Sequence, residues 1–449
     1  MKKLIALLLA CMMVIGLFAA CGETAPEETE APAGNENEAP VEGETEAPAA
    51  SGSVYYLNFK PEADAAWQEL AAVYTQLTGV PVKVVTAASG TYSDTLTAEI
   101  AKDEPVTMYN VGNAQAVVEW ADYTLDLTGT PFAGELATDA FNLYDEAGAL
   151  KAAGYCYESF GIIVNVDLLE AAGHTLDEIT NFESLKAIAE EIHANAETLG
   201  FDAFTSAGLD GSSSWRFSGH LLTVPLHYEF AEDGITEQPA TIKGTYVEYF
   251  KNLWDLYINN TSADAATLTT STGDEAKAMF VEGKAVFHQQ GSWEYAGLTE
   301  AGMTNLAMIP LYCGAPGEEK AGLASGTENC WAVNSQASAE DIQATLDFMY
   351  WVVTSEEGTT MLAEQFGAVP FKAAKTPENV FCANANAYTA AGNYNINWAF
   401  NHTPNVDAYR ATVVTALAAY SADQSEENWN AVVTAIVDGW AYEYNMQNG

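Results

Sequence analysis

The stretch that most constrains the fold is residues 54–112, where strand-like and helix-like patterns alternate. "SVYYLNFK" indicates a strand, "VPVKVV" a second strand, and "VTMYNVG" a third that runs into Gly112. A helical pattern that ends at Gly79 separates the first strand from the second, and a helical pattern over residues 93–101 separates the second from the third. The first helix shows its apolar spacing at Trp67, Leu70, Tyr74 and Leu77. This βαβαβ order predicts a parallel sheet with helices on both faces.

Ligands of such sheets bind at the carboxyl ends of the strands, and polar residues follow each predicted strand here. The candidate ligand-binding residues at these ends are Glu62, Tyr92, Asn110, Asn113 and Gln115. For the last three, a role in capping or turn formation is an equally open interpretation. Glu62 and Tyr92 are candidates for the rim of the site.

The chain after residue 52 contains 397 residues, which is more than a single hydrophobic core usually serves. We therefore expect two lobes. The second half is richer in helical patterns. Residues 338–370 predict two helices, with capping boxes formed by Ser338 with Asp341 and by Thr354 with Glu357.

The N-terminal segment has the pattern of an export signal. Lys2 and Lys3 precede an uncharged apolar run over residues 4–20, and small residues stand before Cys21. Leu17 to Cys21 resembles a bacterial lipobox, although Phe18 departs from its usual small aliphatic residue. We expect residues 1–20 to be a signal peptide, and Cys21 to be lipidated and to tether the protein to the membrane without spanning it.

Residues 21–53 predict an acidic, disordered tether. The segment from residue 22 contains nine glutamates and no basic residue, and is otherwise almost entirely Ala, Pro, Gly, Thr, Ser and Asn. Such a composition cannot bury enough apolar surface to offset the entropy of ordering, and like charges keep it extended. We expect no functional residue in it.

The charge balance excludes several classes of partner. Without the signal segment the chain has 14 basic and 62 acidic residues, a net charge of −48, and the body after the tether carries −39. A surface this acidic repels nucleic acids and anionic lipids. It also disfavours anionic small molecules, so a neutral ligand is the default expectation.

Four cysteines fall in the body, at Cys156, Cys313, Cys330 and Cys382. Free buried thiols and a disulfide are both open, and Cys313 with Cys330, flanking an expected hairpin, is the first pair to consider. None stands in a CxxC pattern, and the six histidines show no metal-ligand spacing. We therefore expect no metal and no cofactor.

A polar and aromatic cluster follows a predicted strand in "GKAVFHQQGSWEYAGL", residues 283–298. The apolar run ends on two glutamines, Gly291 and Trp293. A glycine allows close approach of backbone to a ligand, and a tryptophan offers it a flat apolar face. The alternative is a core tryptophan after a turn.

Three further stretches resemble one protein family. "YESFGIIVNVDLLEAAG", "FVEGKAVFHQQGSW" and "DFMYWVVTSEEGTTMLAEQFGAVP" are similar, in order and spacing, to segments of extracellular solute-binding proteins of family 1. These are the maltose/oligosaccharide-binding lipoproteins of bacterial sugar ABC importers. The resemblance covers nearly all of residues 54–449 and implies an α/β, two-lobed periplasmic-binding-protein-like fold of type II with three interlobe crossovers and hinge closure.

The resemblance also implies lobe boundaries. It places the crossovers near Tyr157, near Gln290 and near Ser335 to Asp341. Lobe one would then contain residues 54–157 and 291–337, and lobe two residues 158–290 and 338–449.

By the same resemblance, Trp293 occupies the position of a tryptophan that stacks on a sugar ring, and Glu158 that of a glutamate that accepts hydrogen bonds from sugar hydroxyls. An exposed acid is the alternative for Glu158. Trp215 and Arg216 fall near the family's aromatic contacts in lobe two, with a core role open for Trp215 and a bidentate contact expected of Arg216.

Trp398 lies where the family often presents another stacking residue. The local pattern departs from the family there, so Arg410 or Tyr409 are alternatives for that position.

The implied function is binding rather than catalysis. We expect a monomeric, extracytoplasmic lipoprotein that captures a neutral di- or oligosaccharide and passes it to the transmembrane subunits of an ABC importer. One alternative keeps the fold with another solute, such as a polyamine, peptide, iron complex or phosphate-bearing compound. The other is a secreted glycoside hydrolase, which would need two carboxyl groups placed across the scissile bond.

Overall fold

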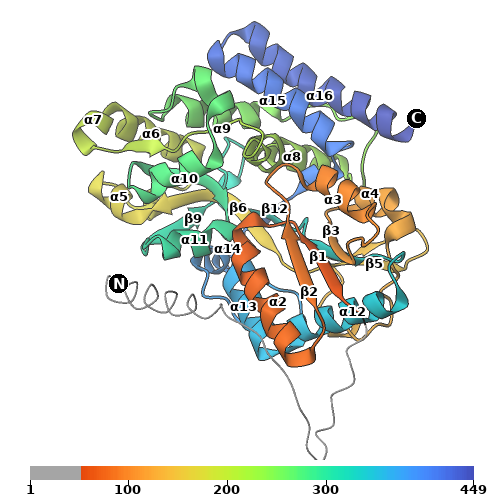
Figure 1. Cartoon of the computed structure of the whole chain (residues 1–449). Helices are drawn as coiled ribbons and strands as arrows, with labels where there is room; N and C mark the ends of the chain where they lie inside the picture. The colour runs from red at the N-terminus through yellow and green to blue at the C-terminus, as the bar shows by residue number, and fades with distance from the viewer. Residues whose placement is uncertain (1–51) are drawn as a thin grey trace, which may run out of the picture. The chain divides into compact units, whose positions relative to one another are not determined.

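The computed structural model describes residues 52–449, which form a mixed α/β structure with two β-sheets (Figure 1). The first sheet has the strand order β2-β1-β3-β11-β5-β4. Its strands are β1 (Val54–Asn58), β2 (Val82–Thr86), β3 (Met108–Val111), β4 (Leu143–Tyr144), β5 (Leu150–Gly154) and β11 (Cys330–Val333). β1 pairs in parallel with both β2 and β3, whereas β11 is antiparallel to β3 and β5. The predicted βαβαβ unit is therefore present.

Helices cover both faces of this first sheet. They are α2 (Asp64–Thr78), α3 (Tyr92–Ile100), α4 (Ala114–Glu119), α12 (Ala339–Thr354) and α13 (Glu356–Phe366). α2 buries Trp67, Leu70 and Tyr74 at helical spacing, and it ends at Gly79, whose φ of 76° and N–H bond to the Thr75 carbonyl form a left-handed cap.

The second sheet is built around β6 (Glu158–Asn165), which is buried almost throughout and pairs antiparallel with three neighbours. The strand order is β12-β10-β6-β8-β7, and β9 also pairs with β6. The other strands are β7 (Asp202–Phe204), β8 (Ala285–Gly291), β9 (Leu306–Ile309), β10 (Ala321–Gly326) and β12 (Tyr394–Asn397).

The helices of the second half surround this sheet and extend beyond it. They are α5 (Val166–Ala171), α6 (Phe182–Ala194), α7 (Ala196–Leu199), α8 (Thr223–Asp233), α9 (Val247–Asn259), α10 (Gly273–Val281), α11 (Tyr295–Glu300), α14 (Val380–Ala390), α15 (Val406–Ala422) and α16 (Glu426–Asn448). A π-helix, η5 (Arg216–Leu221), precedes α8. α15 and α16 lie side by side at the top of Figure 1. The buried face of α9 contains Phe250, Leu253, Trp254 and Tyr257, which recur at helical spacing.

The chain passes between the two sheets at residues 155–157, 327–329 and 367–379. The expectation of a second crossover near Gln290 is wrong, because β8 continues through α11 into β9 and β10 of the same sheet. The expected third crossover near Ser335 to Asp341 is wrong as well. β11 leads into α12 and α13, whose apolar side chains pack in one cluster with those of β1.

Residues 291–326 therefore belong with the second sheet, and residues 338–366 with the first. The capping box at Ser338 correctly marks the start of α12. The second predicted box is displaced by one residue, because Ser355 rather than Thr354 caps α13, accepting a bond from the Gly358 N–H. Ser355 has the extended backbone that an N-cap requires.

The suggested Cys313–Cys330 disulfide is wrong. Cys313 lies in the core of the second sheet, whereas Cys330 lies on β11 of the first, so no hairpin joins them. All four cysteines in residues 52–449 are free and buried.

The predicted signal peptide, the lipidation site at Cys21 and nearly all of the predicted tether lie outside the described residues. Within residues 52–449, no helix has the length and apolar character needed to cross a bilayer.

Candidate functional site

A cavity of about 690 Å³ lies between the two sheets, where β1 and β3 end and β6 begins. Residues from both halves line it, so both contribute to one site. Among the residues predicted from sequence, the lining contains Glu62, Tyr92, Asn110, Asn113, Gln115, Glu158, Trp215 and Trp293. The expected carboxyl edge of the first sheet thus forms one wall.

Aromatic rings form the part of the wall around Trp293. This residue is in η7 (Ser292–Glu294), directly after β8, and it is partly buried. Its ring centroid lies 5.8 Å from that of Trp215 and 5.3 Å from that of His220. Phe400 also lines the cavity, 4.7 Å from the His220 ring. These rings offer flat apolar faces to a ligand.

Gly291 explains how the Trp293 ring can fold back against the end of β8. A Cβ at this position would stand 2.1 Å from the Trp293 ring, although the backbone itself is extended with φ near −101°. The glycine is thus required by the close approach of the indole and not by a left-handed turn.

We therefore expect Gly291→Ala to displace the Trp293 ring and to weaken ligand binding about tenfold, since the ring no longer lies where the ligand would stack on it. Unfolding free energy should change by less than about 1.5 kcal/mol, because only the end of one side chain has to move. Gly134→Ala, where a Cβ meets nothing within 4 Å, is the matched control. Unchanged affinity in Gly291→Ala, measured by calorimetry, would contradict a role for this ring position.

A buried ion pair joins the two sheets at the base of the cavity. Lys60, two residues after β1, places its Nζ 3.0 Å from Oε1 of Glu158, the first residue of β6. The two side chains are 6% and 2% exposed. Asn329 donates to the second Glu158 oxygen at 2.8 Å, and Glu62 lies 3.3 Å from Lys60. The exposed-acid interpretation of Glu158 is therefore wrong.

The lysine also contacts the aromatic wall. Its Nζ lies 5.2 Å from the centroid of the Trp293 ring, within the range of a cation–π interaction. Burial would lower the pKa of Lys60, but the carboxylates of Glu158 and Glu62 outweigh it and raise that pKa. Lys60 is thus held as a cation where the end of β1, the crossover at residues 155–157 and the Trp293 ring meet.

Several buried polar atoms of the cavity wall have no partner in the described part of the protein. They are Oδ1 of Asn110, Nδ1 of His220 and Nε2 of Gln447. Leaving a buried polar atom unpaired costs about 1–3 kcal/mol, so such atoms indicate a site for hydrogen-bonding groups from outside the chain.

His220 is the polar residue most enclosed by aromatic rings. It is 2% exposed, stacks on Phe160 with centroids 5.0 Å apart, and approaches Glu328 with Nε2 at 3.8 Å from Oε1. Burial, and then the charges of Arg410 and Lys60, hold its pKa well below the usual value. The imidazole is therefore neutral at pH 7.

His220 shares this property with His288, a fully buried residue on β8 whose pKa is also lowered well below its usual value by burial, with Arg216 and Lys277 contributing. Below pH 6.5 the unfolded chain binds protons that these folded residues do not, so stability is lost as pH falls. Together, the two buried histidines should lower the unfolding free energy by about 2 kcal/mol between pH 6.5 and pH 5.5. Urea unfolding of His220→Phe should show about half this difference; an unaltered pH dependence would contradict the assignment.

Charged side chains also line the cavity: Asp407 and Arg410 lie near the start of α15, and Glu328 lies between β10 and β11. Arg410 has no ion pair within residues 52–449, and its guanidinium lies against Gly219 and 5.5 Å from the Phe400 ring. Burial raises the pKa of Glu328, and the charges of Arg410 and Lys60 oppose it.

The polar residues at the end of β3 combine contact with the cavity and local structural roles. Asn113 caps α4 by accepting from the Ala116 N–H at 2.9 Å, which is the alternative that its sequence position left open. Asn110 donates through Nδ2 to the Glu328 carbonyl at 3.0 Å, and its N–H donates to the Tyr92 hydroxyl at 2.6 Å. These bonds fix the edge of the wall.

Arg216 and Trp398 do not line the cavity. Arg216 opens the π-helix η5 and is fully buried, with Nη1 and Nη2 unpartnered among the described residues, and burial lowers its pKa to about 10. Trp398 packs on Gly326 and donates to the Ala324 carbonyl at 3.0 Å. Arg410, the alternative to Trp398, lines the cavity, whereas Tyr409 is buried in the core.

Sequence reasoning missed other residues of the wall, among them Lys60, His220, Glu328 and Phe400. Lys60 could have been found, because it stands beside Glu62 at the end of a predicted strand. His220 and Phe400 carry no local signal, since only the packing of distant segments brings them together.

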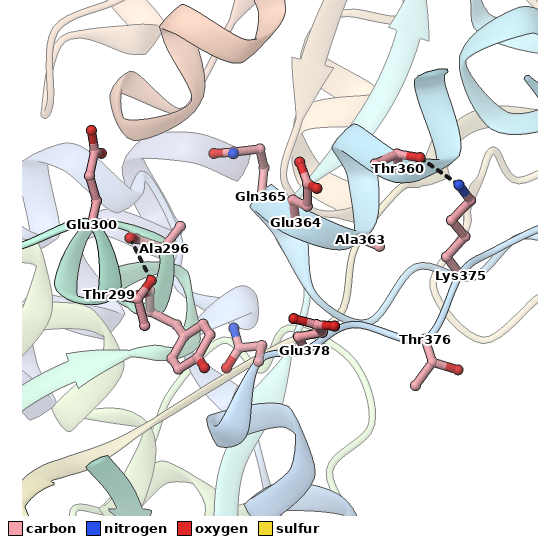
Figure 2. A pocket seen from close by; sticks show the side chains of 12 residues that line it. Ala296, Thr299, Glu300, Thr360, Ala363, Glu364, Gln365, Lys375, Thr376 and Glu378 are labelled. Atoms are coloured by element: carbon pink, nitrogen blue, oxygen red, sulfur yellow. Dashed lines mark hydrogen bonds between the residues drawn. The ribbon is translucent and has the colours of Figure 1, made fainter. Parts of the chain in front are cut away.

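A second cavity, of about 550 Å³, lies between α11, α13 and the segment before α14 (Figure 2). Its lining contains three carboxylates, Glu300, Glu364 and Glu378, and only one aromatic residue, Tyr295. Lys375 is turned toward Thr360, to which it donates at 2.5 Å. No buried polar atom of this lining lacks a partner within residues 52–449, so the first cavity is the better candidate for ligand binding.

Residues 69–389 match the sequence profile described as bacterial extracellular solute-binding protein. No curated protein matches the sequence. Among solved structures, the solute-binding protein RafE in complex with raffinose has 14% identity and a TM-score of 0.68, and the match covers 86% of this chain and 98% of that one. RafE is from Streptococcus pneumoniae.

Two other similar structures carry the same architecture. The GacH receptor of Streptomyces glaucescens, solved unliganded and with acarbose, has 18% identity and a TM-score of 0.64, with 88% and 99% of the two chains covered. A family 1 extracellular solute-binding protein from Bifidobacterium longum subsp. infantis has 17% identity and a TM-score of 0.56, with 87% and 100% covered. These similarities confirm the predicted α/β fold of type II.

Proposed function

This chain belongs to the bacterial extracellular solute-binding proteins, and we propose that its larger cavity captures a neutral di- or oligosaccharide and delivers it to the transmembrane subunits of an ABC importer. The proposal rests on one combination in the cavity wall. Aromatic faces at Trp215 and Trp293 stand beside buried polar atoms without partners, on Asn110 and His220, and beside the carboxylate of Glu158, which pairs with Lys60.

A sugar ring needs both kinds of surface. Its C–H faces pack on aromatic rings, and its hydroxyls donate and accept hydrogen bonds at the ring edge. The carboxylate of Glu158 can only accept, whereas the amide of Asn110 can do both. Similar structures solved with raffinose and with acarbose support a carbohydrate as the ligand class.

A cationic solute such as a polyamine is the second candidate, because five carboxylates line the cavity. They are Glu62, Glu119, Glu158, Glu328 and Asp407. Lys60 already pairs with Glu158 and Glu62, however, and Arg410 adds a second positive charge to the same cavity. This arrangement favours a neutral ligand over a polycation.

A thermal-shift and calorimetric screen separates the two candidates. The probes are neutral oligosaccharides, with spermidine as the cationic comparison. At 100 times its dissociation constant a ligand stabilises by about 2.7 kcal/mol, which a shift in melting temperature reveals. Stabilisation by a sugar and none by spermidine is expected. Binding of spermidine alone, weakening steeply with added salt, would replace the proposal.

Catalysis is no part of the proposal, and turnover of any bound oligosaccharide by the purified protein would contradict it. We also propose that the protein acts as a monomer held at the membrane by lipid on Cys21. Cys21→Ser should then move the protein from the membrane fraction into the medium. Retention of this variant in the membrane fraction would count against a lipid anchor.

A further inference from the structure

The outer part of the larger cavity is formed by two segments far apart in the sequence. Val118 and Glu119, at the end of α4, line it from the side of the first sheet. Met446 and Gln447, in the last turn of α16, line it from the other side. Figure 1 shows the C-terminal end of α16 beside α4. The C-terminal helix thus reaches the mouth of the site.

The mouth exposes two apolar side chains, one from each of the two helices. Val118 and Met446 are each 63% exposed, and both face the same cavity. A single exposed apolar residue needs no explanation, but two that converge on a cavity from opposite walls form an apolar surface available to a ligand.

A strained residue holds the end of α16 in place. Asn405 has a φ of 40°. Among residues 52–449 it is the only residue other than glycine with a positive φ. Its N–H donates to Oε1 of Gln447 at 2.6 Å, and its side chain bonds to Glu443. Strain of this kind persists where surrounding contacts enforce it, frequently at ligand sites.

These bonds leave a donor at the mouth. Nε2 of Gln447 is buried and has no partner in the described part of the chain, although the residue lines the cavity. Asn405 lines it too. The mouth therefore combines apolar side chains with an unpartnered polar atom, as the cavity wall around Trp293 does.

The charge of the mouth selects among ligands. Desolvation in the cavity wall, and then the negative charge of Asp407 on α15, raise the pKa of Glu119. Asp407 thus lies close enough to Glu119 at the mouth for its charge to act on that carboxyl. An anionic group would be repelled there, whereas the neutral ligand of the proposed function would not.

We propose that Val118, Asn405, Met446 and Gln447 form a distal subsite, which binds the outer rings of an extended neutral oligosaccharide whose inner ring lies on Trp293. This inference rests on the proposed function and specifies which residues hold the part of the sugar chain that extends beyond the first ring. A cavity of about 690 Å³ is in the range that encloses drug-sized ligands, which exceeds the size of one sugar ring.

The test is calorimetry with neutral probes of increasing length on the full chain. The probes are malto-, xylo- and chito-oligosaccharides of one to six units, together with raffinose. Affinity should rise with length up to at least the trisaccharide in the series that binds. In Met446→Ser combined with Gln447→Ala, the longest bound probe should lose about tenfold in affinity, and the shortest bound probe less than twofold.

Tyr442→Ser is the matched control. Tyr442 is on the same helix and 61% exposed, but it does not line the cavity, so this variant should bind every probe like the parent. An equal loss for short and long probes in the double variant overturns the subsite and leaves the proposed function standing. Tightest binding of a monosaccharide overturns the subsite and the proposed di- or oligosaccharide ligand together. Failure of every probe to bind overturns both.

Discussion

Trp293→Ala should lower affinity for the bound sugar about a hundredfold, a loss of roughly 2–3 kcal/mol. Aromatic contact contributes about 0.5–1.5 kcal/mol beyond area, and burial of the ring face adds about 25 cal/mol per Å². The ring is partly exposed to the cavity and contacts Lys60, so its loss also removes a cation–π partner at the base of the site. Calorimetry on the folded variant measures the effect.

The same variant distinguishes a binding role from a core role. Trp293 packs on the periphery of the second-sheet core, so some destabilisation is expected. A fully buried tryptophan would cost about 3–5 kcal/mol of unfolding free energy on truncation. We expect less than 3 kcal/mol in urea unfolding. A larger stability loss with unaltered affinity would show that Trp293 serves the core.

Trp254→Ala is the appropriate comparison. Trp254 is fully buried on α9, in the same core, and does not line the cavity. Its truncation should produce the opposite pattern, with a large loss of stability and an affinity near that of the parent for the molecules that remain folded.

The sequence predicted those parts of the fold that depend on local patterns. The alternation of strands and helices over residues 54–112 was sufficient for the parallel unit β2-β1-β3, because periodicity and the cap at Gly79 are properties of neighbouring residues. The start of α12 was also predictable, since Ser338 caps it.

The assignment of segments to lobes was not predictable in the same way. The sequence pattern of α12 shows an apolar stripe but does not say which sheet that stripe covers, and the structure packs Phe348 and Met349 against the first. Likewise β10 and β11 follow each other closely, yet they pair with different sheets, so a hairpin was the wrong expectation.

The residues of the candidate site likewise divide into those that chain order predicts and those that only packing brings together. Residues at strand ends, such as Asn110 and Glu158, were found because the edge of a sheet is a position that the chain order defines. His220 was missed, since its placement depends on a π-helix that packs it among four rings from three distant segments. Arg216 was overvalued because the same π-helix turns it into the interior.

Lys60→Met should destabilise the protein by about 3–5 kcal/mol at pH 7, an effect as large as that expected of truncating a fully buried tryptophan. The change removes the cation that neutralises Glu158 and leaves that carboxylate buried at 2% exposure, with Asn329 as its hydrogen-bond donor. Lys186→Met is the control, because its pair with Glu190 is exposed on both sides and should be worth less than about 1 kcal/mol.

Two further measurements show whether the buried charge causes the loss. In Lys60→Met, Glu158 can become neutral by binding a proton, so the destabilisation should shrink as the pH is lowered. Adding Glu158→Gln should recover most of the lost stability, because no unpaired charge then remains. Ligand affinity should be lower than that of the parent in this double variant, since the amide restores neither the carboxylate acceptor nor the cation beside Trp293. If the double variant is no more stable than Lys60→Met, the ion pair does not hold the two sheets together, and the lysine acts through packing alone.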